Sequence, residues 1–176
     1  MDKEKYIIRR AVKSDAKAFL ALWEVLDRET EFLLYEPGER KVTLKMQREQ
    51  LSRAQGSENS HILVLSDSTS DTLYGFTAGR RSSNARDKHT LDVVIGMCRQ
   101  ATGKGLGFEM LSTLERWAKI QEVARMQLSV LVTNTNALKL YKKLGYVIEG
   151  ERRGTVKLSS GYVNEYVMGK WIADES

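Results

Sequence analysis

The chain has 176 residues, a net charge of +5 at neutral pH and a sequence pI of about 9.3. Hydrophobic residues make up 41% of it and charged residues 29%, a normal globular mix, so we expect residues 1–176 to form one domain. The single cysteine, Cys98, excludes an internal disulfide, and no run reaches the roughly 18 apolar residues that a membrane span needs. With no hydrophobic region of a signal peptide near the start, these features predict a soluble cytoplasmic protein.

Hydrophobic periodicity predicts a series of helices and strands along the chain. The first half is expected to form a strand over 6–12, helices over 15–28 and 39–54, and a hairpin of strands over 62–65 and 73–80. The second half is expected to form a strand over 89–98, a helix from the following glycines to 121, a strand over 125–132, a helix opening at Asn134 and Asn136, and strands over 146–151, 155–158 and 162–171. Ser14 is the expected N-cap of the first helix. This order predicts a mixed sheet with helices packed on its faces, rather than a doubly wound sheet.

The stretch RQATGKGLGFEML, residues 99–111, places three glycines where a helix begins. Glycine inside a helix costs about 1 kcal/mol relative to alanine, so Gly103, Gly105 and Gly107 need a reason. The first N–H groups of a helix have no internal partner, and the absence of side chains lets an anion approach them closely. Lys104 adds a full positive charge beside them. The residues therefore predict a phosphate cradle, with a tight strand-to-helix turn as the open alternative.

The spacing of these glycines fits neither a P-loop nor the dinucleotide-binding fingerprint. QATGKG instead fits the pattern (Q or R)-x-x-G-x-(G or A), and NTNALKLYKKLGY fits N-x-x-A-x-x-x-Y-x-x-x-G-(F or Y). In this order, with one strand between them, the two motifs resemble those of the GNAT superfamily of N-acetyltransferases. The closing run GYVNEYVMGKWI resembles the last hairpin of its polyamine-type and ribosomal-protein-type members.

The resemblance implies a mixed α/β fold of the α+β class, in which four helices flank a mostly antiparallel central sheet of about seven strands. It also implies acetyl-CoA as the co-substrate, with the acetyl-pantetheine arm on Ile95, Gly96 and Met97. The matching pyrophosphate contacts are the main-chain amides of Thr102, Gly103, Lys104, Gly105, Leu106, Gly107 and Phe108. Asn134 matches the motif asparagine that contacts the coenzyme, and Asn136 and Ala137 are neighbours with the same implied role. N-capping of the helix is the open alternative for both asparagines.

The implied reaction is direct attack of a primary amine on the thioester. Tyr141, which also matches a coenzyme contact, is the implied general acid for the departing thiolate. A phenol of pKa about 10 protonates a thiolate of pKa about 8.5 at a cost of roughly 2 kcal/mol, so the role is feasible. From its helical position alone, Tyr141 would be a buried core residue. Asp92 is the candidate base, directly or through water, with an arginine ion pair as its alternative, and a main-chain N–H near Met97 would hold the oxyanion.

Family members build the acceptor pocket from the loop between the first two helices and from the last strands. Here that loop is DRETEFLLYEPGER, residues 27–40, whose acidic and apolar side chains suit a cationic amine. It carries the carboxylates of Asp27, Glu29, Glu31 and Glu36 beside Phe32, Leu33 and Tyr35. Polyamines, peptide N-termini, ribosomal proteins and amine-bearing antibiotics or metabolites all remain open as acceptors. A non-catalytic acyl-CoA-binding module is the alternative function.

The positions of the basic residues and histidines bear on nucleic-acid and metal binding. Three basic clusters, Arg80-Arg81, Arg86-Lys88 and Arg152-Arg153, lack interleaved aromatic residues, so we expect no nucleic-acid partner. We expect no membrane partner either. His61 and His89 have no partner spacing, so no metal site is expected. By resemblance to the family, a homodimer is the default assembly.

Overall fold

The structure is a computed structural model of the chain, and it describes residues 5–173. Within that range the chain forms seven strands, four α-helices and two 3-10 turns. The strands are β1 (Tyr6–Arg10), β2 (Ser60–Asp67), β3 (Leu73–Arg81), β4 (Thr90–Met97), β5 (Arg125–Leu131), β6 (Val147–Leu158) and β7 (Gly161–Trp171). The α-helices are α1 (Ala16–Glu29), α2 (Leu44–Gln55), α3 (Leu106–Ile120) and α4 (Thr135–Lys143), and the 3-10 turns are η2 (Lys13–Asp15) and η3 (Arg99–Ala101).

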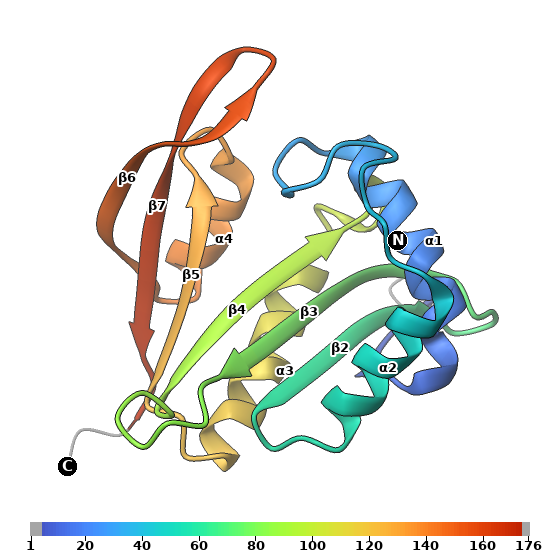
Figure 1. Ribbon diagram of the computed structural model, residues 1–176. Coiled ribbons are helices and arrows are strands. Elements are labelled where there is room, and N and C mark those ends of the chain that lie inside the picture. Colours follow the sequence, from blue (N-terminus) through green and yellow to red (C-terminus); the bar gives the residue numbers. More distant parts are fainter. Residues whose placement is uncertain (1–4, 174–176) are drawn as a thin grey trace.

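One sheet runs through the molecule in the strand order β1-β2-β3-β4-β5-β7-β6. Neighbouring strands are antiparallel except β4 and β5, which are parallel. The last pair of that parallel ladder is Asp92 with Gln127, and beyond it the two strands diverge (Figure 1). The predicted mixed, mostly antiparallel sheet is therefore confirmed, and it is split between β4 and β5.

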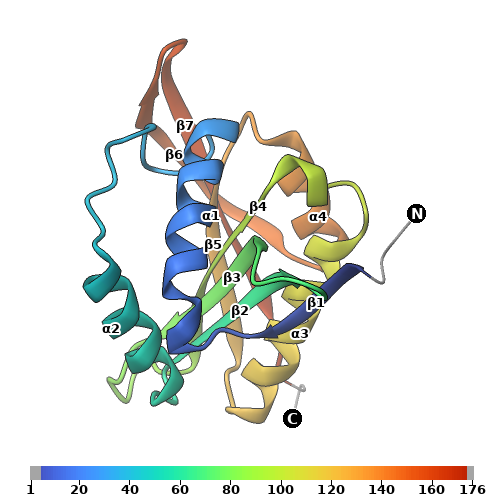
Figure 2. The same cartoon turned by 90° about the vertical axis from the view of Figure 1, so that its right-hand side faces the viewer.

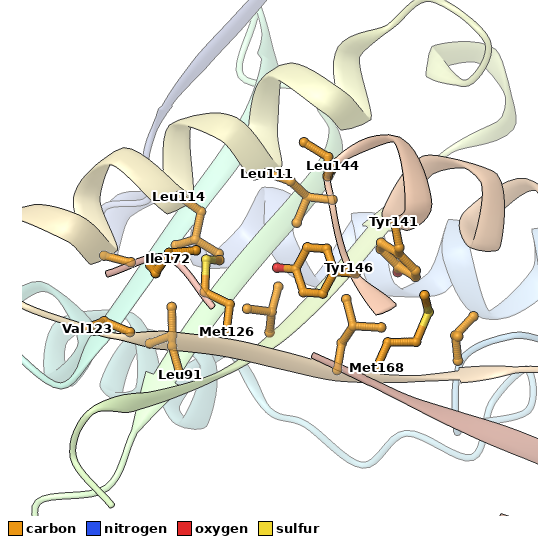
Figure 3. Packing of buried hydrophobic residues seen from close by; sticks show 14 of the residues in the cluster. Leu91, Leu111, Leu114, Val123, Met126, Tyr141, Leu144, Tyr146, Met168 and Ile172 are labelled. Atoms are coloured by element: carbon orange, nitrogen blue, oxygen red, sulfur yellow. The ribbon is translucent and has the colours of Figure 1, made fainter. Parts of the chain in front are cut away.

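The helices form two layers, with α1 and α2 on one face of the sheet and α3 and α4 on the other (Figure 2). Each layer buries an apolar stripe against the sheet, because helical spacing brings residues such as Leu22 and Leu26 onto one face. On the α3 and α4 side, the buried cluster includes Leu91, Leu111, Leu114, Met126 and Met168 (Figure 3). None of the helices in the part of the chain described is long and apolar enough to cross a membrane.

The prediction of separate strands over 146–151 and 155–158 is wrong, because residues 147–158 form the single continuous strand β6. The register of β6 against β7 shifts around Gly154, which has a φ of +62°. Asn164 on β7 spans this irregularity: its Oδ1 accepts from the Gly154 N–H at 2.9 Å, and its Nδ2 donates to Glu151 at 2.6 Å. A glycine that is typical of a turn is here a bulge inside a strand.

Two helix starts also differ from the prediction. Ser14 lies inside η2 and is not the N-cap of α1, which has no side-chain cap. The neighbouring Asp15 directs its carboxylate back to Arg9 and to the Val12 N–H, both at 2.8 Å, instead of capping α1. The helix expected from residue 39 begins later, after Thr43, whose hydroxyl accepts from the Met46 N–H at 3.2 Å. A side-chain N-cap therefore sets the start of α2, whereas α1 continues directly from η2 without one.

A buried ion pair fixes the loop between α1 and α2. Arg40 donates hydrogen bonds of 2.8 and 2.9 Å to the Asp27 carboxylate near the end of α1. The Arg40 guanidinium also lies 3.9 Å from the ring centre of Trp23 and 4.2 Å from that of Tyr35. The side chains of Arg40 and Asp27 are only 13% and 4% exposed, so water screens the pair weakly.

Replacing Arg40 with methionine should lower the free energy of unfolding by about 3 kcal/mol, because a buried carboxylate then loses its charged partner. Urea denaturation at neutral pH measures this change. The double variant Asp27→Asn, Arg40→Met is the control, and it should recover part of the loss because no unpaired buried charge remains. A loss below about 1 kcal/mol in the single variant would contradict the prediction, since that is the value of an exposed pair.

Candidate active site

The divergence of β4 from β5 leaves one edge of β4 without a neighbouring strand beyond Asp92. On its other edge β4 stays paired with β3, and the Cys98 N–H that follows it donates to the Tyr74 carbonyl at 2.8 Å. Main-chain groups of alternate residues point to alternate edges of a strand, so those of Ile95 and Met97 point into the gap. These two residues can therefore form hydrogen bonds with an extended ligand that lies between the strands.

Gly96, which lies between Ile95 and Met97, has a structural role. Its main chain belongs to the ladder with β3, where it lies opposite Phe76, so its N–H and C=O groups point away from the gap. A Cβ at this position would lie 2.8 Å from the Phe76 ring and 3.1 Å from Leu26 of α1. Glycine is needed here because the α1 side of the core packs directly against β4.

A run of main-chain N–H groups, those of residues 103–108, makes no hydrogen bond within the described range 5–173. Thr102 is not part of this run, because its N–H donates to the Arg99 carbonyl at 3.1 Å. The expected run therefore started one residue too early, and it ends where the hydrogen bonds of α3 begin. Consecutive unpaired donors at a helix start carry partial positive charge and form an anion site.

The three glycines of this stretch are needed for two different structural reasons. Gly103 and Gly105 have φ values of +74° and +80°, which cost other residues about 1–2 kcal/mol. Both are exposed, and a Cβ on Gly103 would meet no atom within 4 Å, which leaves space for a ligand. Gly107 is buried inside α3, where a Cβ would lie 3.2 Å from Leu140 and 3.3 Å from the Met97 sulfur. Two glycines thus shape the segment with unpaired amides, and the third lets α3 pack closely on its neighbours.

The side chains of this run divide between core and surface. Leu106 is buried in the core below α3. The Lys104 ammonium group hydrogen-bonds the Gln100 carbonyl and stays close to the unpaired amides. Phe108 is half-buried, and the Lys143 ammonium nitrogen lies 5.2 Å from its ring centre. The anion site therefore has a cation at its start and a second one beside its last residue.

Helix α4 begins after the far end of β5, on the other side of the gap (Figure 1). Asn134 Oδ1 accepts from the Ala137 N–H at 3.2 Å, which confirms the N-capping interpretation for this residue. Asn136 is exposed, and its side chain makes no hydrogen bond in the part of the chain described. Ala137 packs against the core below α4. The Asn136 amide is thus fully available to a ligand, whereas Asn134 can offer only its Nδ2 group.

Tyr141 points from α4 into the apolar cluster on this side of the sheet, next to Tyr146 (Figure 3). The two ring centres are 5.9 Å apart, and Tyr141 is only 6% exposed. Its hydroxyl makes no hydrogen bond to any residue between 5 and 173, and burial raises the pKa of Tyr141 to about 12. The interpretation as a core tyrosine describes its position correctly. A hydroxyl with this pKa keeps its proton at neutral pH and can donate it.

Asp92 lies at the base of the gap, in the last pair of the β4–β5 ladder. Its Oδ1 accepts from the Gln127 Nε2 at 2.8 Å. The arginine ion pair that was its alternative is wrong, because the partner is this neutral amide. Gln127 therefore orients the carboxylate without neutralising it, so Asp92 can still attract a cation. The sequence had not pointed to Gln127, since the register of two strands distant in the chain leaves no local signal.

Two members of the expected acidic acceptor set are already engaged in the fold. Asp27 belongs to the buried ion pair described above. The Glu29 carboxylate accepts from the Arg99 N–H at 2.7 Å, and its carbonyl accepts from the Arg99 side chain at 2.8 Å. Glu31 and Glu36 are exposed, and neither carboxylate forms an ion pair with another described residue. Of the four expected carboxylates, two thus remain available to a cationic acceptor.

An open strand edge beside a run of unpaired amides has the donors and acceptors to bind an extended ligand with an anionic end. The chain belongs to the acetyltransferase (GNAT) family, whose model matches residues 19–146. That range contains the free edge of β4, the unpaired amides and Tyr141. No cluster of three or more His, Cys, Asp or Glu residues that could hold a metal ion occurs among residues 5–173.

Known proteins resemble the chain in sequence and in fold. The L-amino acid N-acetyltransferase AaaT of Escherichia coli (strain K12) is 31% identical over 91 residues, which are 48% of this chain and 53% of that protein. The match thus spans about half the length of this relative. The crystal structure of an acetyltransferase of the GNAT family from Streptococcus pneumoniae has a TM-score of 0.90 and 26% identity, covering 96% of this chain and 100% of that one.

A third likeness concerns the fold alone. The structure of yncA, a putative acetyltransferase from Salmonella typhimurium solved with its cofactor acetyl-CoA, has a TM-score of 0.83. The two chains are 17% identical, and the match covers 98% of this chain and 96% of that one. The mixed, split sheet with helices on both faces is thus the fold of known acetyltransferase structures.

Proposed function

We propose that this protein transfers the acetyl group of acetyl-CoA to a primary amine. The observation that carries the proposal is the run of unpaired amides at 103–108 beside the free edge of β4. Membership of the acetyltransferase family supports the reaction, and the neighbour solved with acetyl-CoA supports the co-substrate. The relative named as an L-amino acid N-acetyltransferase supports an amine acceptor.

The residues fit the two chemical parts of the co-substrate. Acetyl-CoA supplies, when bound, a thioester that an amine can attack. The amides of residues 103–108 would hold its diphosphate, with Lys104 adding charge. The main-chain groups of Ile95 and Met97 would hold the pantetheine arm, and the Asn136 amide would contact the coenzyme as well. Holding both parts orients the thioester, and the Met97 N–H stabilises negative charge that develops on its oxygen.

Asp92 and Tyr141 move the protons. An alkylammonium group must lose a proton before its nitrogen can attack, and Asp92, oriented by Gln127, attracts the cation and accepts that proton directly or through water. Tyr141 donates its proton to the departing thiolate. Against a thiol of pKa about 8.5, a tyrosine of pKa about 12 makes this transfer uphill by about 5 kcal/mol. That cost is well below the barrier of about 16 kcal/mol that corresponds to about ten turnovers per second.

Amine-dependent release of free thiol tests the proposal. The purified protein is mixed with acetyl-CoA and a panel of L-amino acids, polyamines and short peptides, and a reaction without amine is the control. We expect thiol release that requires one class of amine and saturates with acetyl-CoA, with the acetylated amine identified by mass spectrometry. A silent panel combined with saturable acetyl-CoA binding would contradict catalysis and favour the non-catalytic acyl-CoA-binding module.

Three expectations from the sequence stay predictions: the single domain, the cytoplasmic location and the homodimer. For the homodimer, β6 is an edge strand of the sheet and is mostly exposed along its length. Such an edge presents unpaired main-chain groups that a second copy could extend.

A further inference from the structure

The C-terminal end of α1 lies beside the turn η3, which follows β4, and the two cap each other (Figure 1). The half-buried Glu29 accepts from the N–H of Arg99, the first residue of η3, at 2.7 Å. In return the Arg99 guanidinium donates to the carbonyl of Glu29, the last residue of α1, at 2.8 Å. Cys98, the N-cap residue of η3, provides no side-chain cap of its own. A carboxylate from a distant helix therefore takes that role.

The turn η3 leads directly into the run of unpaired amides. The Thr102 N–H donates to the Arg99 carbonyl at 3.1 Å, and the Thr102 hydroxyl donates to the same carbonyl at 2.8 Å. Gly103, the first residue of the run, comes next. Glu29 thus holds Arg99, and Arg99 holds the residue from which the run begins.

A carboxylate is unfavourable near an anion site. Through its charge alone, Glu29 repels a diphosphate and weakens the binding of the coenzyme. Its hydrogen bond acts in the opposite direction. Gly103 and Gly105 give the segment more conformational freedom than other residues would, so ordering it on binding lowers the affinity. A bond that holds the preceding turn in place reduces that loss.

We propose that Glu29 is a positioning residue for the coenzyme: through Arg99 it fixes the start of the run at 103–108 and so strengthens acetyl-CoA binding. The proposal rests on the proposed function, because it concerns the same site. The sequence had placed Glu29 among the carboxylates for the acceptor. Its partner lies 70 residues further along the chain, so no local pattern reveals this contact.

Calorimetric titration of acetyl-CoA into two variants separates the hydrogen bond from the charge. Glu29→Ala removes both and should weaken binding about fivefold, since one hydrogen bond corresponds to a factor of about 2–12. Glu29→Gln removes the charge but keeps an oxygen that can accept from the Arg99 N–H, so its affinity should stay within about twofold of the wild-type value. Glu24→Ala is the matched control: it removes an exposed carboxylate of α1, which pairs with Arg28 at 3.9 Å, and should leave the affinity unchanged.

Arg99→Pro tests the same bond from the other side. Proline lacks the N–H that Glu29 accepts, and it is favoured as the first residue of a helix. The preceding Cys98 has a φ of −62° and a ψ of 146°, a conformation that a following proline allows. In the Arg99→Pro background, Glu29→Ala should leave the affinity for acetyl-CoA unchanged or raise it, because only the repulsive charge is then removed.

Steady-state kinetics gives a readout that a loss of stability would not move. Glu29→Ala should raise the KM for acetyl-CoA about fivefold and keep kcat within about twofold, because Glu29 acts through Arg99 and not on the reacting atoms.

The outcomes separate this role from the proposed function. Wild-type affinity in Glu29→Ala would overturn the positioning role, and so would equal losses in Glu29→Ala and Glu29→Gln, or equal losses with and without Arg99→Pro. In each case acetyl-CoA binding by the wild-type protein would stand. If Arg99→Pro does not fold, the comparison of the two Glu29 variants decides alone. The absence of acetyl-CoA binding by the wild-type protein would instead contradict the proposed function.

Discussion

Replacing Tyr141 with phenylalanine is expected to lower kcat by about a hundredfold while leaving the KM for acetyl-CoA largely unchanged. A positioned general acid contributes about 10²–10⁴-fold to a rate, and the substitution removes only the donating hydroxyl. The phenylalanine ring keeps its place in the apolar cluster, where Tyr141 is 6% exposed. Steady-state thiol release with the best amine of the panel measures the effect.

Tyr146→Phe is the matched control for this experiment. Tyr146 lies in the same cluster, with its ring centre 5.9 Å from that of Tyr141, and its buried hydroxyl has no partner in the range described. Removing that hydroxyl breaks no hydrogen bond, so kcat should not change. An equal fall of kcat in both variants would trace the effect to core packing. An unchanged kcat in Tyr141→Phe would contradict the role of Tyr141 as general acid.

The pH dependence gives a second readout of the same residue. A general acid must be protonated to act, and burial raises the pKa of Tyr141 to about 12. Activity should therefore not be lost through this residue as the pH rises from neutral toward that pKa. A fall of kcat on the alkaline side near pH 8 that disappears in Tyr141→Phe would contradict the raised pKa.

Replacing Gly105 with alanine is expected to weaken acetyl-CoA binding by at least about tenfold. At a φ of +80° an alanine is strained by about 1–2 kcal/mol, and relief of that strain turns the neighbouring amides out of alignment. The new Cβ also lies in the segment whose main chain must approach the diphosphate. The dissociation constant from calorimetry measures the loss.

Gly38→Ala is the control for backbone strain. Gly38 has a φ of +82°, and a Cβ at this position would meet no atom within 4 Å. It lies in the loop between α1 and α2, outside the run of unpaired amides. Its substitution should lower stability about as much as Gly105→Ala and leave the affinity for acetyl-CoA unchanged. Equal affinities of Gly105→Ala and wild-type protein would contradict the anion site at this helix start.

Order and class of the elements could be predicted because they depend on local patterns. The alternation of Met126, Leu128 and Val130 predicted a strand with one buried face, and all three lie in the core of the α3 and α4 side. A glycine is typical of the position just past a helix end, and Gly145 follows α4 with a φ of +88°. Each of these signals lies within a few residues of the feature that it predicts.

Features that depend on contacts between distant segments could not be predicted. Gly154 has the composition of a turn, but the partner strand converts it into a bulge through Asn164. Gly107 was assigned to the anion site, yet the close approach of Leu140 on α4 explains it better. No local pattern indicates that Asp27 meets Arg40, so its carboxylate was counted as free for a substrate.

The candidate site also combines features that local sequence patterns predict with features that depend on distant contacts. Motif spacing pointed to the stretch that contains the unpaired amides, because a helix start and its glycines are adjacent in the chain. Motif spacing does not reveal which main-chain groups are free. The predicted ligand contacts therefore include Thr102, whose N–H donates to Arg99, and Gly96, whose main chain pairs with β3. The partner of Asp92 depends on the register of β5, which only the assembled sheet defines.

Titration of acetyl-CoA into the wild-type protein in a calorimeter tests whether the unpaired N–H groups of residues 103–108 bind the diphosphate of the co-substrate. We predict a saturable heat with one site per chain and an affinity that falls in Gly105→Ala. The absence of saturable heat, or a normal affinity in that variant, would contradict the account.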